Sequence, residues 1–334
     1  MPVDVLVPVK EKTDVAVARR TALEMASLTG LKKTDMGAVG IVATEAATNL
    51  IKHGGGGDIV LRELRGSLEP VMELIAWDRG KGMGNLAHCF QDGYSTAGSP
   101  GTGLGAIARL ASFHQVYSHT ACGTVLVAHI GPPRPTREWF DVGAISVPYP
   151  GESVCGDAWV LRASYGRCRV MIADGLGHGL YASEAAARAV DTVKDHQSLG
   201  PLALLEDVHL RLRGTRGAAV AVADLDFSAG ALTFAGVGNI SGSIVSGPDR
   251  RQMVSMNGTV GHEMRKLQLY QYPLPPDALV ILHSDGLSAN WALEKYPGLT
   301  SHHPSVIAAV LLRDFRRLRD DATVVVFHAS DFTP

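Results

Sequence analysis

The sequence feature that most limits the possible folds is a proline-rich segment near the middle of the chain. Residues 131–137 hold three prolines within four positions. Proline lacks a backbone N–H and disfavours helix, so we expect a short, stiff connector there. A chain of 334 residues is long for one domain and comfortable for two. We therefore expect one domain over residues 1–131, a linker over 132–138 and a second domain over 139–334.

Charge and cysteine content narrow the class of protein. Lys and Arg number 31 and Asp and Glu 33, a net charge of −2, so nothing favours bulk attraction to nucleic acid or to a membrane surface. The four cysteines show no C-x-x-C spacing, which argues against a disulfide framework or zinc knuckle and is typical of a reducing compartment. No signal peptide or membrane-spanning apolar run is recognised. The expected location is the cytoplasm, with no nucleic-acid or membrane partner.

The first half of the chain alternates helical and strand patterns. Apolar residues recur at helical spacing over residues 16–28 and 36–51, whereas β-branched and apolar residues dominate 71–77 and 124–130. Residues 101–113 combine a glycine-rich loop with the start of a third helix. These patterns predict an α/β sandwich.

Strand patterns are more frequent in the second half. The expected strands are residues 168–173, 218–225, 231–235, 278–283 and 323–329, with 225–231 as a hairpin connection. The expected helices are residues 181–196, 201–213 and 305–318. Many short strands with a few long helices indicate a sheet sandwich covered by helices, so the whole chain is expected to be α+β.

A polar stripe on the second predicted helix is the first candidate functional feature. Glu45, Asn49 and His53 follow one another at intervals of four residues, which places them on one helical face. A carboxylate beside a carboxamide suits phosphoryl transfer, because one group can activate a nucleophile and the other can hold Mg²⁺. Taken alone, the stripe indicates an ordinary solvent-facing helix surface more readily than a functional site.

An acidic residue followed by alternating glycines is the second feature. Asp78 ends a predicted strand, and Gly80 and Gly82 come after it. Glycine lets the backbone approach a ligand, and the carboxylate can accept a hydrogen bond from an amino group such as that of adenine. A simple Asp-Gly turn would give the same pattern.

A glycine-rich loop before an apolar helix is the third feature. Its residues are Gly101, Thr102, Gly103, Leu104 and Gly105. Backbone amides and a helix N-terminus can cradle phosphates. The spacing also matches a dinucleotide-binding pattern, but no buried strand precedes it, as that fold requires. A P-loop is excluded because its G-x-x-x-x-G-K-[ST] motif is missing.

Together, in this order and spacing, the three features resemble the N, G1 and G2 boxes of the GHKL ATPases, the fold of gyrase, Hsp90 and histidine kinases. The resemblance covers nearly all of residues 1–131 and is strongest to the anti-sigma-factor serine kinases of the RsbT/RsbW group. It implies that Asn49 coordinates Mg²⁺, that Asp78 reads adenine and that Glu45 is general base toward a protein hydroxyl. Lys52 and His53 either contact phosphate or are solvated. The implied ATP-binding residues are Asn49, Lys52, His53, Asp78, Gly80, Gly82, Gly101, Thr102, Gly103, Leu104, Gly105 and Thr124.

Aspartates recur at strand ends in the second half. Asp157 follows Cys-Gly, Asp174 and Asp285 each end an apolar strand and precede glycine, and Asp320 and Asp321 precede the last strand. Carboxylates at neighbouring sheet edges can converge on hard divalent cations, and oxygen-only ligands favour Mg²⁺ or Mn²⁺ over zinc. Two such ions can activate a water for attack on a phosphoryl group. Any one Asp-Gly pair could be only a turn.

The order G-D, D-G-x-G-H-G, S-D-G, D-D-A-T resembles the PPM protein phosphatases in their bacterial SpoIIE/RsbX-type branch, over residues 139–330. The implied fold is an αββα sandwich. The implied metal ligands are Asp157, Asp174, the Gly175 carbonyl, Asp285 and Asp320. The four aspartates are also the implied catalytic residues of this half. Asp320 is preferred over Asp321 as ligand, and His178 is either a proton donor or a spacer. The basic phosphate-binding residue of eukaryotic relatives has no recognisable counterpart.

The two resemblances imply a bifunctional regulator of bacterial partner switching. A serine/threonine kinase using ATP and Mg²⁺ would be joined to a phosphatase using two Mn²⁺ or Mg²⁺ ions. The implied partners are STAS-type anti-sigma-factor antagonists, with a sigma factor and a second copy of the chain as further candidates. In the alternative hypothesis only the phosphatase is catalytic, and the N-terminal domain is an ATP sensor or a sigma- or STAS-binding module. A GHKL ATPase driving conformational work is disfavoured because no transducer domain follows.

Overall fold

The chain folds into two compact units. The computed structural model describes residues 4–64, 69–84, 103–120, 122–133, 140–196 and 198–329. The N-terminal unit comprises residues 2–136 together with Ser301–Arg313, and the C-terminal unit comprises residues 137–300 and 314–334. The predicted α+β class is confirmed. The predicted boundaries remain a prediction, because much of the expected linker lies outside the described residues.

The N-terminal unit is built on one antiparallel sheet with strand order β1-β2-β3-β5-β4. Its strands are β1 (Val5–Val9), β2 (Gly57–Glu63), β3 (Met72–Asp78), β4 (Phe113–Ser118) and β5 (Thr124–Ile130). The prediction for β5 matches residue for residue. β1, β2 and β4 were not predicted.

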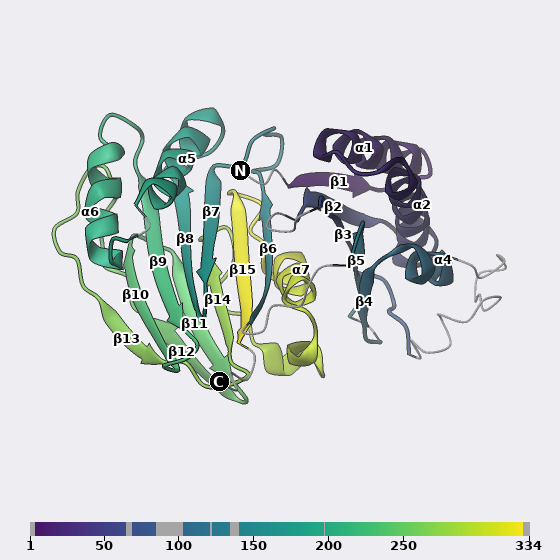
Figure 1. Ribbon diagram of the computed structural model, residues 1–334. Helices are drawn as coiled ribbons and strands as arrows, with labels where there is room; N and C mark the ends of the chain where they lie inside the picture. The colour runs from purple at the N-terminus through teal and green to yellow at the C-terminus, as the bar shows by residue number, and fades with distance from the viewer. Residues whose placement is uncertain are drawn as a thin grey trace. The chain divides into compact units, whose positions relative to one another are not determined.

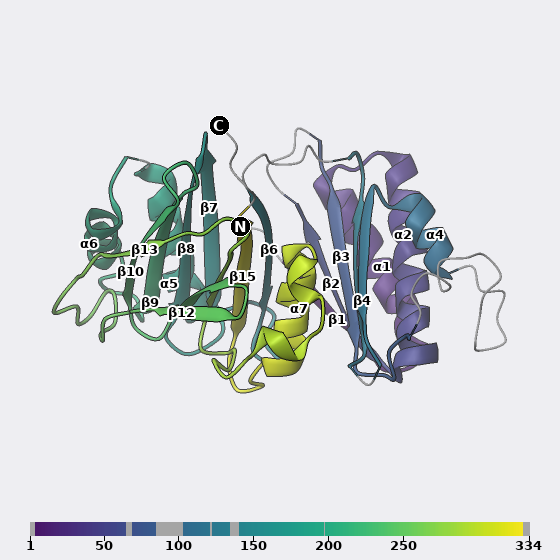
Figure 2. The same cartoon turned by 90° about the horizontal axis from the view of Figure 1, so that it is seen from below.

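Three helices cover one face of this sheet, α1 (Asp14–Thr29), α2 (Lys33–Asn49) and α4 (Gly103–Leu110) (Figure 1). Helix α1 buries Ala18, Ala22 and Ala26, which lie on one helical face because they are four residues apart. Their small side chains let α1 pack closely on the apolar core of the unit. Helix α7 (Pro304–Phe315), whose residues as far as Arg313 belong to this unit, lies on the opposite face (Figure 2).

The second predicted helix ends earlier than expected. Regular α-helix stops at Asn49, and a π-helical turn, Leu50–Gly54, follows. His53 therefore lies on the π-helical turn, beyond the regular helix that carries Glu45 and Asn49. Such π-turns are rare and are often found at functional sites.

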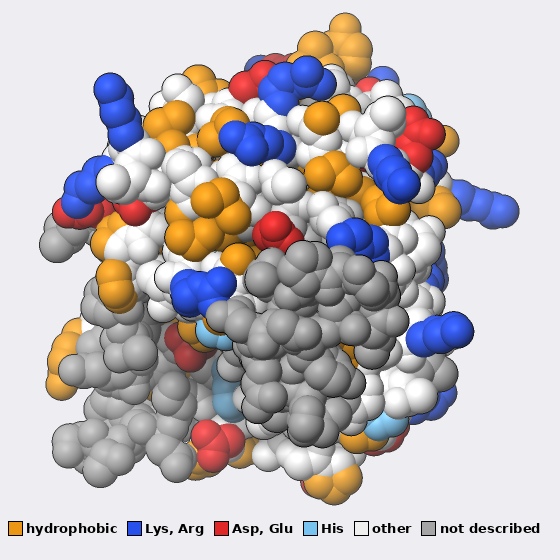
Figure 3. Space-filling view, turned by 90° about the vertical axis from the view of Figure 1, so that its right-hand side faces the viewer, with side chains coloured by type: hydrophobic (Ala, Val, Ile, Leu, Met, Phe, Trp, Pro, Cys, Tyr) orange, Lys and Arg blue, Asp and Glu red, His pale blue; other side chains and the backbone are white. Residues whose placement is uncertain are grey.

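The surface of the N-terminal unit on the side of α2 and α4 carries mixed charge. On the described part of the face in Figure 3, Lys and Arg side chains are interspersed with apolar, uncharged and acidic ones. Among the large apolar side chains exposed on α1 and α2 are Val17, Leu28 and Ile41. The distribution agrees with the balanced composition of the chain.

The C-terminal unit is a sandwich of two antiparallel sheets. One has the order β13-β10-β9-β8-β7 and the other β12-β11-β14-β15-β6. The strands of the first sheet are β7 (Asp157–Ser164), β8 (Arg167–Gly175), β9 (Ala218–Asp226), β10 (Ala231–Val237) and β13 (Tyr270–Pro273). Those of the second are β6 (Phe140–Val147), β11 (Ser241–Ser246), β12 (Asp249–Met253), β14 (Leu279–His283) and β15 (Ala322–Ala329).

Two apolar layers stabilise this unit. Phe140, Phe234 and Phe327 are fully buried in one cluster with residues from both sheets. Helices α5 (Leu180–Asp195) and α6 (Pro201–Arg211) lie on the first sheet (Figure 1), and their apolar side chains form a second cluster with it. No helix in the described part of the chain is both long and apolar enough to cross a membrane.

Candidate functional site

Two aspartates meet at one end of the first sheet of the C-terminal unit. Asp157, the first residue of β7, pairs directly with Asp174 near the end of β8. Ser284, which follows β14 in the other sheet, donates its hydroxyl hydrogen to Asp157 Oδ2 at 2.7 Å. The backbone N–H of Thr323 donates to that same hydroxyl at 3.0 Å. Hydrogen bonds through Ser284 therefore join the two sheets at Asp157.

Three further carboxylates belong to the same cluster. Asn239 Nδ2 donates to Asp285 Oδ2 at 2.6 Å, and burial and the nearby Asp285 raise the pKa of Asp320. The neighbouring Asp321 is only 2% exposed. Its Oδ1 accepts the backbone N–H of Tyr149 at 2.8 Å.

Burial and mutual repulsion disfavour the charged form of the carboxylates in this cluster. Burial is the largest cause that raises the pKa of Asp157 and Asp174, and neighbouring carboxylates raise both further. Asp157 Oδ1 and Asp321 Oδ2 are buried and have no hydrogen-bond partner in the part of the chain that the structure describes. A Cβ on Gly156 would lie 2.5 Å from Asp321 Oδ2, so the backbone closes tightly over that carboxylate. Buried, uncompensated carboxylate oxygens fit hard divalent cations.

Among the described residues, no group of three or more His, Cys, Asp or Glu side chains is arranged so that it could hold a metal ion. Each of three carboxylates is nevertheless held by one oxygen, Asp157 by Ser284, Asp285 by Asn239 and Asp321 by Tyr149. Hydrogen bonds of this kind orient ligands toward a metal.

A histidine lies beside the cluster on the loop after Asp174. The Nδ1 atom of His178 is 2.8 Å from Glu152 Oε1, and the imidazole stacks on the Tyr149 ring with centroids 4.3 Å apart. A carboxylate at Nδ1 fixes the tautomer and leaves Nε2 available for a proton. This arrangement favours the proton-donor hypothesis for His178 over a spacer role.

The predicted kinase residues meet at the last turns of α2. A Cβ on Gly103, the first residue of α4, would lie 2.8 Å from Glu45 Oε2 and 3.5 Å from Asn49 Oδ1. The carboxylate and the carboxamide therefore face the start of a helix, where backbone N–H groups favour phosphate. Gly101 and Thr102 lie outside the described residues, so the rest of the predicted phosphate loop is not placed.

Asp78 occupies the end of β3, as predicted, and is buried. Its Oδ1 accepts the backbone N–H groups of Gly80 at 2.7 Å and Thr124 at 3.2 Å. Burial raises the pKa of Asp78, and these two bonds oppose the rise. Both bonds use the same oxygen, which leaves Oδ2 for a donor such as the adenine amino group.

The other predicted ATP-binding residues have mixed surroundings. Lys52 and His53 are exposed on the π-helical turn. Gly80 and Gly82 approach protein backbone, because Cβ atoms there would lie 2.7 Å from His53 O and 2.1 Å from His119 O. On α4, Leu104 packs on the core and Gly105 is buried.

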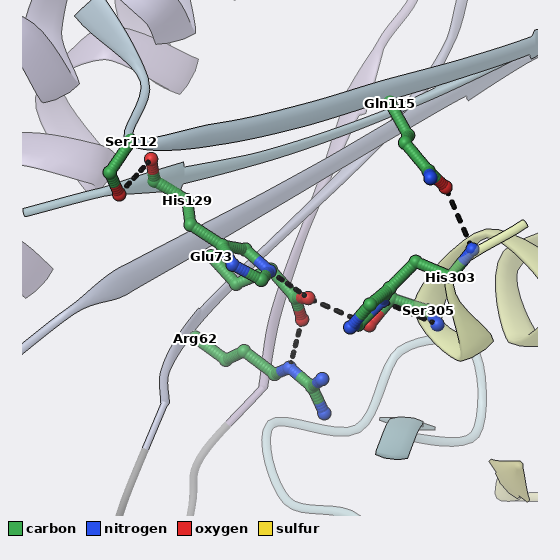
Figure 4. Close-up of polar contacts among 7 residues, drawn as sticks. All are labelled: Arg62, Glu73, Ser112, Gln115, His129, His303 and Ser305. Carbon is green, nitrogen blue, oxygen red and sulfur yellow. Dashed lines mark hydrogen bonds and ion pairs between the residues drawn. The ribbon is translucent and has the colours of Figure 1, made fainter. Parts of the chain in front are cut away.

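A buried polar network lies on the other face of the N-terminal sheet (Figure 4). Glu73 on β3 forms an ion pair with Arg62 on β2, and its Oε1 lies 2.9 Å from His129 Nε2. Ser305 of α7 donates to that same Oε1 at 2.7 Å. Burial alone would raise the pKa of Glu73, but Arg62, His129 and His303 lower it well below its usual range.

The sequence analysis missed a basic residue near the predicted adenine site. Arg313, near the end of α7, donates from Nη1 to the backbone carbonyl of Asp78 at 3.2 Å. Its only signal in the sequence is a charge at the end of an apolar helical run. Tyr149, whose backbone N–H holds Asp321, was not predicted either.

The N-terminal half is similar to known ATP-binding domains. Residues 9–130 match the histidine kinase-like ATPase domain. The serine/threonine-protein kinase RsbT of Bacillus subtilis is 27% identical over 115 residues, which cover 34% of this chain and 86% of RsbT.

The C-terminal half is similar to bacterial phosphatases. The phosphoserine phosphatase RsbX of Bacillus subtilis is 25% identical over 154 residues, 46% of this chain and 73% of RsbX. A solved structure from work on the bacterial stressosome is 26% identical and has a TM-score of 0.53. It covers 56% of this chain and 98% of that chain. The fold is shared with a structure of the Bacillus subtilis SpoIIE phosphatase domain that includes a fragment of its regulatory domain. That structure is 16% identical, has a TM-score of 0.51 and covers 97% of this chain and 99% of that chain. Residues 164–330 match the Stage II sporulation protein E (SpoIIE) family, and this chain belongs to that family.

Proposed function

We propose that the chain is a bifunctional regulator, a protein serine/threonine kinase and a metal-dependent phosphoserine/threonine phosphatase in one polypeptide. Its proposed substrates are STAS-type antagonists of anti-sigma factors in bacterial partner switching. Similarity of its two halves to RsbT and RsbX, both from one organism, supports this pairing. A cytoplasmic location stays a prediction from the sequence.

The observation that carries the proposal is the cluster of five aspartates, in which Asp157 Oδ1 is buried and has no hydrogen-bond partner among the described residues. We infer that Asp157, Asp174, the Gly175 carbonyl, Asp285 and Asp320 would hold two Mn²⁺ or Mg²⁺ ions. When bound, such ions activate a water and offset phosphoryl charge.

The surrounding residues prepare the phosphatase site. Ser284 and Asn239 each hold one oxygen of a carboxylate and leave the other for the cluster. With Glu152 at its Nδ1, His178 would hold a proton at Nε2 for the departing serine oxygen.

In the N-terminal unit, Glu45 would accept the proton of the substrate hydroxyl and Asn49 would hold Mg²⁺. Their common approach to Gly103 supports these roles, because the first turn of α4 can bind phosphate. Asp78 would accept a hydrogen bond from adenine through Oδ2.

The full-length chain and a purified STAS-domain protein test both activities. With γ-labelled ATP and Mg²⁺, Asp174→Asn should accumulate labelled partner because removal of the phosphate is blocked. The matched double variant Glu45→Gln/Asp174→Asn should not. Wild-type chain with Mn²⁺ should remove the label from the product of Asp174→Asn, and EDTA should prevent it. If Asp174→Asn binds ATP but never labels a partner, the N-terminal unit is a non-catalytic sensor or binding module.

A further inference from the structure

Arg216 lies directly beside the loop that follows Asp174. The β8–β9 register pairs Gly175 with Ala218, and the backbone N–H of Leu176 donates to the Gly217 carbonyl at 3.0 Å. The arginine is therefore held where strand β9 begins, next to the predicted metal-binding end of β8. A Cβ on Gly177 would lie 3.0 Å from Arg216 Nη1. The guanidinium group thus rests on the backbone of this loop.

The positive charge of Arg216 has no acidic partner among the described residues. Arg169, Arg188 and Arg211 each form ion pairs with acidic side chains. Arg216 is exposed and forms no ion pair with any other described residue, although five aspartates cluster at this end of the unit. Its guanidinium carbon lies 5.3 Å from the centre of the Tyr181 ring, and a contact of this kind orients the guanidinium plane.

An oriented, unpaired guanidinium is suited to a phosphoryl group. Its planar fork can donate two parallel hydrogen bonds to phosphate oxygens, whereas a lysine acts as a point charge. We propose that Arg216 binds the phosphoryl oxygens of the phosphoprotein substrate at the Asp157–Asp174 site. The assignment rests on the proposed phosphatase function.

The surroundings of Arg216 fit a protein substrate. Leu176, Leu180 and Tyr181 are 48%, 69% and 62% exposed, and they lie on the same loop and the first turn of α5. Large apolar side chains beside a charged group are typical of protein-binding surfaces. Arg216 contacts only the phosphoryl group in this proposal, so its loss should affect small phosphate esters as well.

The test uses the full-length chain with Mn²⁺ and p-nitrophenyl phosphate as substrate. Arg216→Ala should raise KM about 10- to 100-fold, the range for a lost charged hydrogen bond, with kcat changed less than about 3-fold. The inhibition constant of inorganic phosphate should rise by the same factor, and Arg216→Lys should recover part of the loss. Arg213→Ala is the matched control, because Arg213 is exposed three residues earlier. It should leave KM unchanged.

Three results would overturn the proposal. An unchanged KM and phosphate inhibition constant in Arg216→Ala would exclude a phosphate contact. Equal losses in Arg213→Ala would show an effect of net charge. A wild-type chain that does not hydrolyse p-nitrophenyl phosphate would refute the phosphatase function itself and this proposal with it. Arg216→Gln, which keeps much of the side-chain stem, replaces Arg216→Ala if the latter fails to fold by circular dichroism.

Discussion

Replacing Glu73 by leucine should strongly destabilise the N-terminal unit. Glu73 is fully buried, and its carboxylate is the ion-pair partner of Arg62, which is 3% exposed. Breaking a buried pair by removing one partner costs about 3–5 kcal/mol, because a buried charge loses its compensation. Asp4 also attracts Arg62, so we expect a value near the lower end, about 3 kcal/mol. Ser305 and His129 would lose their acceptor as well.

The measurement is hydrogen exchange of the full-length chain, which reports local unfolding free energy. Peptides from β2, β3 and β5 should exchange about 100-fold faster in Glu73→Leu, while peptides from β8 and β9 serve as internal control. The double variant Arg62→Met/Glu73→Leu should recover most of the loss, because an apolar pair replaces a buried ion pair at little cost. A loss below about 1 kcal/mol in the single variant, or no recovery in the double variant, would refute the reasoning.

Three further predictions concern the two candidate sites. Asp174→Asn should abolish metal-dependent hydrolysis of p-nitrophenyl phosphate while leaving circular dichroism unchanged, and activity that survives both this change and EDTA would contradict the metal assignment. Asn49→Ala should abolish Mg·ATP binding measured by calorimetry. Glu45→Gln should keep ATP binding and slow phosphoryl transfer about 10²–10⁴-fold. If Glu45→Gln transfers phosphate at the wild-type rate, Glu45 is not the general base and the kinase hypothesis lacks one. In EDTA, the melting temperature should fall as pH rises above 6. Burial raises the pKa of Asp157 and Asp174 above the ordinary value of 3.8. The folded chain therefore holds more protons than the unfolded chain in this pH range, and its stability falls as pH rises. Mn²⁺ should reduce this fall, and a melting temperature in EDTA that stays level from pH 6 to 8 would count against the shifts.

Strands and helices with a clear apolar pattern could be predicted from sequence. The strand at residues 124–130 has the expected limits, and the helix predicted over residues 201–213 starts at Pro201 as expected and ends at Arg211. Strand β12 (Asp249–Met253) was missed because four of its five residues are polar, and it exists only through pairing with β11. Its local pattern therefore contains no strand signal.

The positions of several candidate residues were predictable from their motifs, whereas their roles stay predictions. Asp78, Asp157 and Asp174 stand where their motifs indicated. Arg216 and Arg313 were not found, because an arginine has no local sequence signature for a contact made through tertiary structure. Both became visible only when sheet register and helix packing placed them beside Gly177 and Asp78.

Helix α7 shows why the proline-rich segment is a poor place to divide this protein for experiments. The SpoIIE match at residues 164–330 includes α7, but the contacts of Ser301–Arg313 place these residues in the N-terminal unit. A fragment ending at the linker would remove Ser305 from Glu73 and Arg313 from the carbonyl of Asp78. Glu73 would keep its ion pair with Arg62, yet part of a buried carboxylate would face water. Loss of ATP binding in such a fragment would therefore report a damaged sheet face, so variants of the full-length chain are the valid comparison.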